Sequence, residues 1–188
     1  MQPSRSWALA ARLGPVVGLA AYSVYFLTAR MMDLGDCAYF THRVHLVFHE
    51  AGHIFLLWAP PVWHAFGGTL GQLLVPLTLV VAVAAKNRDG YAAAICAWWL
   101  GNSLVDVAPY INDARMMQLT LLGGSTGMEV EGHDWNFILE HMGWLTYDIR
   151  LARAVLMGGR IVMVVALAVA VGFAIRTFIA NAPSEVRE

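Results

Sequence analysis

Two histidines and a glutamate form the pattern His49-Glu50-Ala51-Gly52-His53. On a helix, positions four residues apart share a face, so both imidazoles can bind one metal ion. Glu50 lies beside them and can accept a proton from a metal-bound water. A catalytic zinc site has three protein ligands and one open position, so this pattern predicts a third ligand elsewhere in the chain.

The third ligand can be sought by elimination. The longer HExxHxxGxxH motif is absent, and no glutamate occurs between residues 51 and 128. From the end of the motif to residue 113 the carboxylates are Asp89, Asp106 and Asp113. Asp89 falls in a polar turn, whereas Asp106 lies inside an apolar segment at a depth that matches the histidine pair to within about one helical turn. We therefore predict Asp106 as the third metal ligand.

The composition is that of a membrane protein. Of 188 residues, 59% are hydrophobic and 13% are charged, and the mean hydropathy is +0.58. A soluble domain carries about 25% charged residues. The net charge of −1 gives no basic field for a nucleic acid, so none is expected as a partner. Two cysteines provide no disulfide framework.

Apolar segments of near-spanning length predict an all-α, polytopic membrane protein with about five transmembrane helices. We place them in one membrane domain covering residues 1–188, at about 8–29, 40–59, 69–85, 91–111 and 152–180. The paired prolines and glycines of APPVWHAFGG predict a helix stop and a tight return between the second and third helices. Eleven arginines against one lysine favour a bacterial source, and hence the bacterial inner membrane.

Burial distinguishes a metal centre from an accidental motif. An isolated HExxH pattern arises by chance in many soluble sequences, and a lone intramembrane histidine can be satisfied by a neighbouring helix. Here the two histidines, the glutamate and Asp106 all lie in apolar segments, where each unpaired ionisable group costs several kcal/mol. A bound metal ion would compensate them.

Further polar residues leave two interpretations open. His45, with His42, extends the histidine stripe toward the start of the second segment. Hydration near the membrane surface is the simpler account, and a second metal site or a proton path is the alternative.

The loop 112–149 is predicted to contain a short amphipathic helix at about 134–145. Asp134 would cap this helix, with Trp135, Ile138 and Leu139 resting on the membrane core. Alternatively, His133 or Asp134 reaches the metal pocket as an additional ligand, a lid or a substrate clamp.

Over residues 40–113 the chain resembles the site-2-protease family of intramembrane zinc metalloproteases. The matching features are the HExxH motif, the glycine pair Gly67-Gly68, and the segment GNSLVD that ends in Asp106. The resemblance implies a three-helix metal-binding core in which His49, His53 and Asp106 hold Zn²⁺. It also implies that Asn102, one turn before the aspartate, binds substrate backbone or an oxyanion.

The resemblance further implies that Glu50 is the catalytic base, and that the protein hydrolyses a peptide bond in a transmembrane or membrane-adjacent protein within the lipid bilayer. Departures are Val107 where the family commonly has glycine, and the lack of a substrate-selecting domain. Two other functions stay open. One is a membrane metalloenzyme with a one- or two-metal His/Asp centre acting on a lipid-soluble substrate, and the other is a metal-binding or metal-transport protein. The oligomeric state is unknown from sequence.

Overall fold

The computed structural model describes residues 5–36, 39–130 and 132–180, and the regular structure in these ranges is entirely helical. The protein is therefore all-α, as predicted. Its elements are α1 (Arg5–Thr28), α2 (Met31–Gly35), α3 (Phe40–Phe55), α4 (Pro61–Ala85), α5 (Gly90–Asn112), α6 (Gly127–Val130), α7 (Asp134–His141), the 3₁₀ helix η1 (Leu145–Tyr147) and α8 (Asp148–Ala180).

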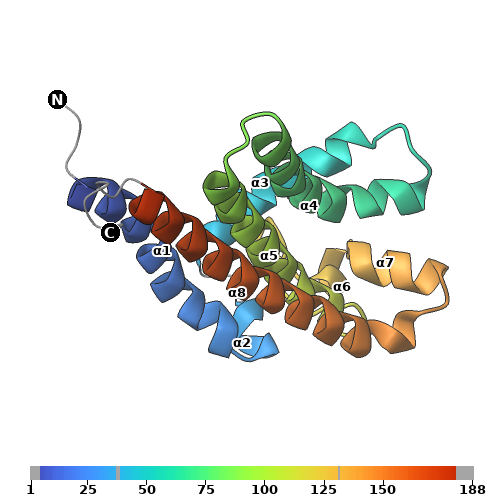
Figure 1. The fold of residues 1–188 in the computed structure, drawn as a ribbon. Coiled ribbons are helices and arrows are strands. Elements are labelled where there is room, and N and C mark those ends of the chain that lie inside the picture. Colours follow the sequence, from blue (N-terminus) through green and yellow to red (C-terminus); the bar gives the residue numbers. More distant parts are fainter. Residues whose placement is uncertain (1–4, 37–38, 131, 181–188) are drawn as a thin grey trace.

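Helix α5 lies at the centre of the bundle. It packs along α8, the longest helix, and α1 covers another side of α8 (Figure 1). On its other side α5 contacts α4, which in turn packs against α3 and α7. Residues from α3, α4, α5 and α7 are thereby brought to one end of the bundle.

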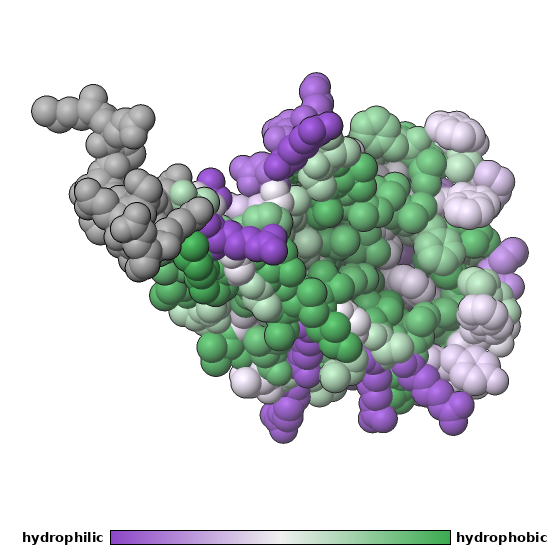
Figure 2. Space-filling model, in the orientation of Figure 1, coloured by the Kyte–Doolittle hydropathy of each residue, from purple (hydrophilic) through white to green (hydrophobic). Residues whose placement is uncertain are grey.

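Three helical segments are long and apolar enough to cross a membrane, namely Leu9–Thr28, Pro61–Ala85 and Leu145–Ala180. The face shown in Figure 2 is largely hydrophobic across its middle, with hydrophilic side chains gathered at its upper and lower edges. Large apolar side chains such as Val165 and Val169 of α8 are exposed. In water such surface would be costly, but lipid accepts it, so the fold supports a membrane protein.

Each of the five segments predicted to span the membrane contains a helix, but two of these helices do not meet the spanning criteria. Helix α3 has 16 residues, about 24 Å at the α-helical rise, against a hydrocarbon thickness of about 30 Å. Helix α5 has 23 residues, yet its polar groups lower its hydropathy. Crossing of the bilayer by α3 and α5 stays a prediction.

The connection between α3 and α4 differs from the sequence prediction. Helix α3 ends at Phe55, and α4 begins at Pro61, eight residues earlier than expected. Proline is favourable in the first helical turn because its missing N–H has no intrahelical partner there. Gly67 and Gly68 consequently lie inside α4, and the prediction of a tight return at these glycines is wrong.

Glycines allow α3 and α4 to cross closely. A Cβ atom on Gly52 of α3 would overlap the carbonyl oxygen of Gly67, and one on Gly71 would overlap that of Phe48. The backbones therefore meet without intervening side chains, as in small-residue helix crossings in membranes. This contact fixes the helix that carries the HExxH motif against α4.

A similar crossing between α5 and α8 yields the first testable prediction. A Cβ on Gly159 would lie 2.7 Å from the Gly101 carbonyl oxygen, whereas a Cβ on the adjacent Gly158 would meet no atom within 4 Å. Gly159→Ala is expected to lower the stability by about 1–3 kcal/mol through overpacking. Gly158→Ala should be neutral or stabilising. Thermal unfolding in detergent compares them, and equal midpoints for the two variants would contradict this packing.

Helix α7 brings the loop after α5 back onto the bundle. Its Trp135, Ile138 and Leu139 are buried, as predicted, and Trp135 Nε1–H donates a hydrogen bond to Thr69 Oγ1 of α4 at 3.1 Å. The observed helix ends at His141 rather than near residue 145. Burial of this face holds the start of α7 beside α3 and α4.

Candidate metal centre

The two motif histidines and an aspartate from α7 converge at one point. His49 Nε2 lies 3.1 Å and His53 Nε2 lies 3.2 Å from Asp134 Oδ2. One potential ligand atom from each residue lies within 4.8 Å of the other two. Among the described residues, His49, His53 and Asp134 therefore form a group that could hold a metal ion. The side chains are 11%, 17% and 22% exposed, so the centre is shielded yet reachable.

Hydrogen bonds fix the orientation of both imidazoles. His53 Nδ1 lies 2.9 Å from the carbonyl oxygen of His64, which can only accept, so Nδ1 carries the proton. His49 Nδ1 lies 3.4 Å from Gln72 Oε1. In each ring the Nε2 atom therefore faces Asp134, and an N–H donated from the other nitrogen is the usual support of a metal-binding histidine.

Asp134 is positioned by residues of α5 and α7. Its backbone N–H donates to Tyr110 Oη at 3.0 Å, and Tyr110 Oη lies 3.4 Å from Asp134 Oδ2. The cap of α7 is His133, whose Nδ1 accepts from the Asn136 N–H at 3.1 Å, and not Asp134 as one interpretation had it. His133 Nε2 lies 3.4 Å from Asp113 Oδ2 at the end of α5. His133 thus anchors the helix, which frees the Asp134 side chain for the histidine pair.

The charge states of these residues agree with their positions. Burial alone would raise the pKa of Asp134, but the His49 and His53 imidazoles beside its carboxylate hold it well below its usual range. Asp134 is therefore ionised at neutral pH, as a metal ligand must be. Burial lowers the pKa of His133, so this ring is neutral and has the free lone pair that its capping role needs.

Asp106, predicted as the third ligand, faces other partners. Tyr39 Oη–H donates to its Oδ1 at 2.6 Å, and His42 Nδ1 lies 2.9 Å from the same oxygen. Its Oδ2 accepts from Gln72 Nε2 at 2.6 Å and lies 3.2 Å from His45 Nδ1. In the structure the motif histidines therefore contact Asp134, and Asp106 contacts His45 and His42, which lie one and two turns earlier on α3. Asp134, which follows the loop after α5, occupies the position that the sequence predicts for Asp106.

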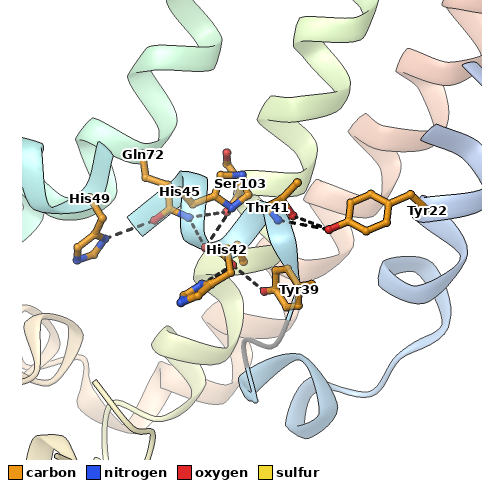
Figure 3. Close-up of polar contacts among 9 residues, drawn as sticks. Tyr22, Tyr39, Thr41, His42, His45, His49, Gln72 and Ser103 are labelled. Atoms are coloured by element: carbon orange, nitrogen blue, oxygen red, sulfur yellow. Dashed lines mark hydrogen bonds and ion pairs between the residues drawn. The ribbon is translucent and has the colours of Figure 1, made fainter. Parts of the chain in front are cut away.

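The interpretation of His45 as a hydrated residue near the membrane surface is wrong. His45 is fully buried, and neither of its ring nitrogens has a hydrogen-bond partner among the described residues. It lies on the face of α3 that packs toward α5, where its Nδ1 contacts Asp106. His42, one turn earlier, keeps a side chain that is 25% exposed and also contacts Asp106. Figure 3 shows His42, His45 and Tyr39 gathered on one side of Gln72, with His49 on the other.

The two residues predicted to be catalytic are placed differently. Glu50 is half-buried on α3, directly after His49 and three residues before His53, and its carboxylate makes no hydrogen bond within the part of the chain that the structure describes. Asn102 is fully buried on α5, and neither amide atom has a hydrogen-bond partner among the described residues. The Glu50 carboxylate is available for proton transfer, whereas no hydrogen bond in the described part of the chain links Asn102 to the metal centre.

The packing of His49 against α4 gives the second prediction. A Cβ atom on Gly68 would overlap Nε2 and Cε1 of the His49 ring. Gly68→Ala is therefore expected to displace this ring and weaken metal binding about tenfold or more, which is the range for disturbing a ligand's support. Gly172→Ala, where a Cβ meets no atom within 4 Å, is the control. Competition with a chelator measures affinity, and circular dichroism checks folding. Unchanged affinity in Gly68→Ala would contradict this ring position.

Sequence reasoning missed Gln72 and Tyr110. Gln72 is a buried amide in a mostly apolar helix, and a polar side chain of that size in such a segment was a signal that could have indicated a role. Tyr110 carries no such signal, because a tyrosine near a predicted span end is ordinary. The sequence allows Asp134 as an additional ligand, but depth matching favours Asp106 as the third.

Comparison with known proteins adds no assignment: no family model, curated protein or solved structure matches this chain.

Proposed function

We propose that the protein is a membrane-embedded zinc metallopeptidase, which holds one ion on His49, His53 and Asp134 and hydrolyses a peptide bond of a membrane protein. The observation that carries this proposal is the convergence of both motif imidazoles on Asp134 Oδ2 at 3.1 and 3.2 Å, with Glu50 adjacent in sequence. Two imidazoles and one carboxylate are a frequent ligand set of catalytic zinc and leave its fourth position open.

The chemistry of the donor atoms fits such an ion. Asp134 is ionised, and both histidines direct Nε2 toward it while their Nδ1 atoms are engaged elsewhere. With the proton on Nδ1 of each neutral ring, both Nε2 atoms and the Asp134 carboxylate are acceptors, and a cation between them would satisfy all three. When bound, Zn²⁺ acts as a Lewis acid on the scissile carbonyl and lowers the pKa of a coordinated water to about 7.

The side chains around the centre supply the remaining functions. Glu50 accepts the proton of the attacking water and returns it to the leaving amine. Tyr110 Oη lies 3.4 Å from Asp134 Oδ2, so its phenol is close enough to the ligands to donate a hydrogen bond to a substrate oxygen. Asn102 has no part in this scheme, because its amide is fully buried and makes no hydrogen bond within the described residues.

The position of the centre favours a peptide in the membrane as substrate. The HExxH helix α3 is held between α4 and α5, beside helices long and apolar enough to span a bilayer, and we infer that α3 and α5 also lie within the membrane. A transmembrane helix hides its peptide bonds in hydrogen bonds, so the substrate must unwind locally before attack. Helix-breaking residues in the substrate would assist that step.

A single ion is preferred to a two-metal centre on a specific observation. In the described residues one group has three potential ligand atoms close enough to share an ion, and the residues around Asp106 do not form a second such group. Asp106 is instead surrounded by hydrogen-bond donors. This favours hydrolysis at one metal over the two-metal oxidation or hydrolysis considered from sequence.

The proposal can be tested on the full-length chain in lipid vesicles. The probe is a quenched-fluorescence peptide with an apolar helix of about 20 residues that is interrupted by Gly-Pro. Cleavage is expected, it should cease when a chelator removes the metal, and Zn²⁺ should restore it, with the new termini identified by mass spectrometry. Metal retained without cleavage, accompanied by zinc flux into the vesicles, would replace the peptidase by a transporter. Purified protein that retains no metal would overturn the centre itself.

A further inference from the structure

Asp106 is a buried carboxylate that is in contact with four polar side chains. Its side chain is 4% exposed, and it contacts Tyr39 Oη, His42 Nδ1, His45 Nδ1 and Gln72 Nε2 at 2.6–3.2 Å. Tyr39 and Gln72 donate hydrogen bonds to this carboxylate, His42 Nδ1 lies at hydrogen-bond distance, and His45 Nδ1 adds a contact at 3.2 Å. Such a compensated anion is costly to build inside an apolar bundle, and stability alone is a weak reason to keep it.

The carboxylate decides which way the Gln72 amide points. The NH₂ and C=O ends of a glutamine amide are nearly alike in shape, so their hydrogen-bond partners distinguish them. Because Asp106 Oδ2 needs a donor, the Gln72 Nε2 group faces it, and a second contact of 3.4 Å from Nε2 to the Ser103 carbonyl oxygen requires the same orientation. The Gln72 Oε1 atom is consequently turned toward α3.

Gln72 in turn decides which nitrogen of His49 carries a proton. Oε1 can only accept, and it lies 3.4 Å from His49 Nδ1, so Nδ1 must hold a hydrogen (Figure 3). The lone pair of a neutral His49 ring is then on Nε2, which points to Asp134. His53 needs no such arrangement, because its Nδ1–H donates directly to the backbone carbonyl of His64.

We propose that Asp106 and Gln72 are positioning residues, which orient His49 from α5 through α4 so that its Nε2 is presented as a metal ligand. This inference rests on the metal centre of the proposed function. Asp106 is thereby not a metal ligand. It acts on His49 through two successive hydrogen bonds, one between Asp106 and Gln72 and one between Gln72 and the His49 ring. This linkage also explains why Gln72 is buried in an apolar helix: its two ends join Asp106 to His49.

The test compares three variants of the full-length chain in detergent. Gln72→Leu removes the link at similar size, and Asp106→Asn removes the acceptor that orients it. Ser103→Ala is the matched control, because it deletes a buried hydroxyl that has no hydrogen-bond partner in the described part of the chain. Three readouts are used: Co²⁺ affinity by chelator competition, the visible spectrum of the Co²⁺ form, and ¹⁵N NMR of the histidine rings of the metal-free protein at mildly alkaline pH.

Gln72→Leu and Asp106→Asn are expected to weaken Co²⁺ binding about 10–100-fold each, the range for losing the outer partner of a metal ligand. The double variant should be little worse than either one, because both act through one hydrogen bond. At saturating Co²⁺ the spectrum should keep its shape, since no ligand is lost. In the metal-free protein the Nδ1–H signal of His49 should be retained in Ser103→Ala and diminished in both other single variants.

Each contrary result has a distinct meaning. If Gln72→Leu binds Co²⁺ as tightly as the unaltered chain and keeps the Nδ1–H signal, the positioning role is overturned and the metal centre stands. If Asp106→Asn changes the Co²⁺ spectrum while Gln72→Leu does not, Asp106 is a direct ligand and the inference is wrong. If the unaltered chain binds no Co²⁺, the proposed function fails, and the role of Gln72 in metal binding fails with it.

Discussion

Asp134→Ala is expected to abolish stoichiometric metal binding by the purified protein. This residue supplies the carboxylate on which both motif histidines converge, at 3.1 and 3.2 Å. A four-ligand structural zinc site binds with about 10–16 kcal/mol, so one ligand contributes about 3 kcal/mol, and its loss should weaken binding about 100–1000-fold. Metal content per chain after purification, followed by chelator competition, measures the effect.

Glu140→Ala is the matched control for that experiment. Glu140 is an exposed acidic residue of the same helix, so its removal changes the net charge of α7 equally without touching the centre. It should retain a full complement of metal. Asp134→Ala that keeps its metal would exclude Asp134 from the ligand set and return the third position to Asp106.

Glu50→Gln should separate metal binding from catalysis. The substitution keeps the shape of the side chain and removes its basicity, so the ion should bind within about threefold of its normal affinity while peptide cleavage falls by about 10²–10⁴, the usual contribution of a general base. Cleavage of the vesicle-bound peptide probe and metal content are measured on the same preparation. Glu50 makes no hydrogen bond among the described residues, so the fold should be unaffected.

Retained cleavage in Glu50→Gln would remove this residue from the role of base. The hydrolytic assignment would then depend on another acceptor, and Tyr110 would be the next residue to replace, by phenylalanine. Loss of metal from Glu50→Gln would instead indicate that the glutamate is itself a ligand, which favours a storage or transport site.

The long helices and the histidine pair could be predicted from sequence because both depend on short-range information. Each predicted apolar segment contains a helix, although α4 starts earlier because two prolines begin it rather than end the helix before it. The spacing of His49 and His53 places both rings on one face of α3, and their ring centroids are 4.9 Å apart. Local periodicity was sufficient for these features.

The third member of the candidate centre could not be predicted in the same way. Depth matching assumed straight, parallel helices, and it placed Asp106 level with the motif. In the structure Asp106 contacts His42 and His45, and α7 folds back so that Asp134 lies beside the motif histidines. The amphipathic pattern predicts that Trp135, Ile138 and Leu139 are buried, but it does not specify the helices against which they pack, and this long-range packing sets the position of Asp134.

The origin of the ligands on two separate segments has a consequence for biosynthesis. Asp134 follows His53 by about 80 residues, so at bacterial or eukaryotic elongation rates of about 5–20 residues per second the ribosome releases it about 4–16 seconds later. During that interval α3 has its histidines but lacks the carboxylate on which they converge. A nascent or prematurely terminated chain therefore lacks the complete group of His49, His53 and Asp134 until α7 has been made and has docked.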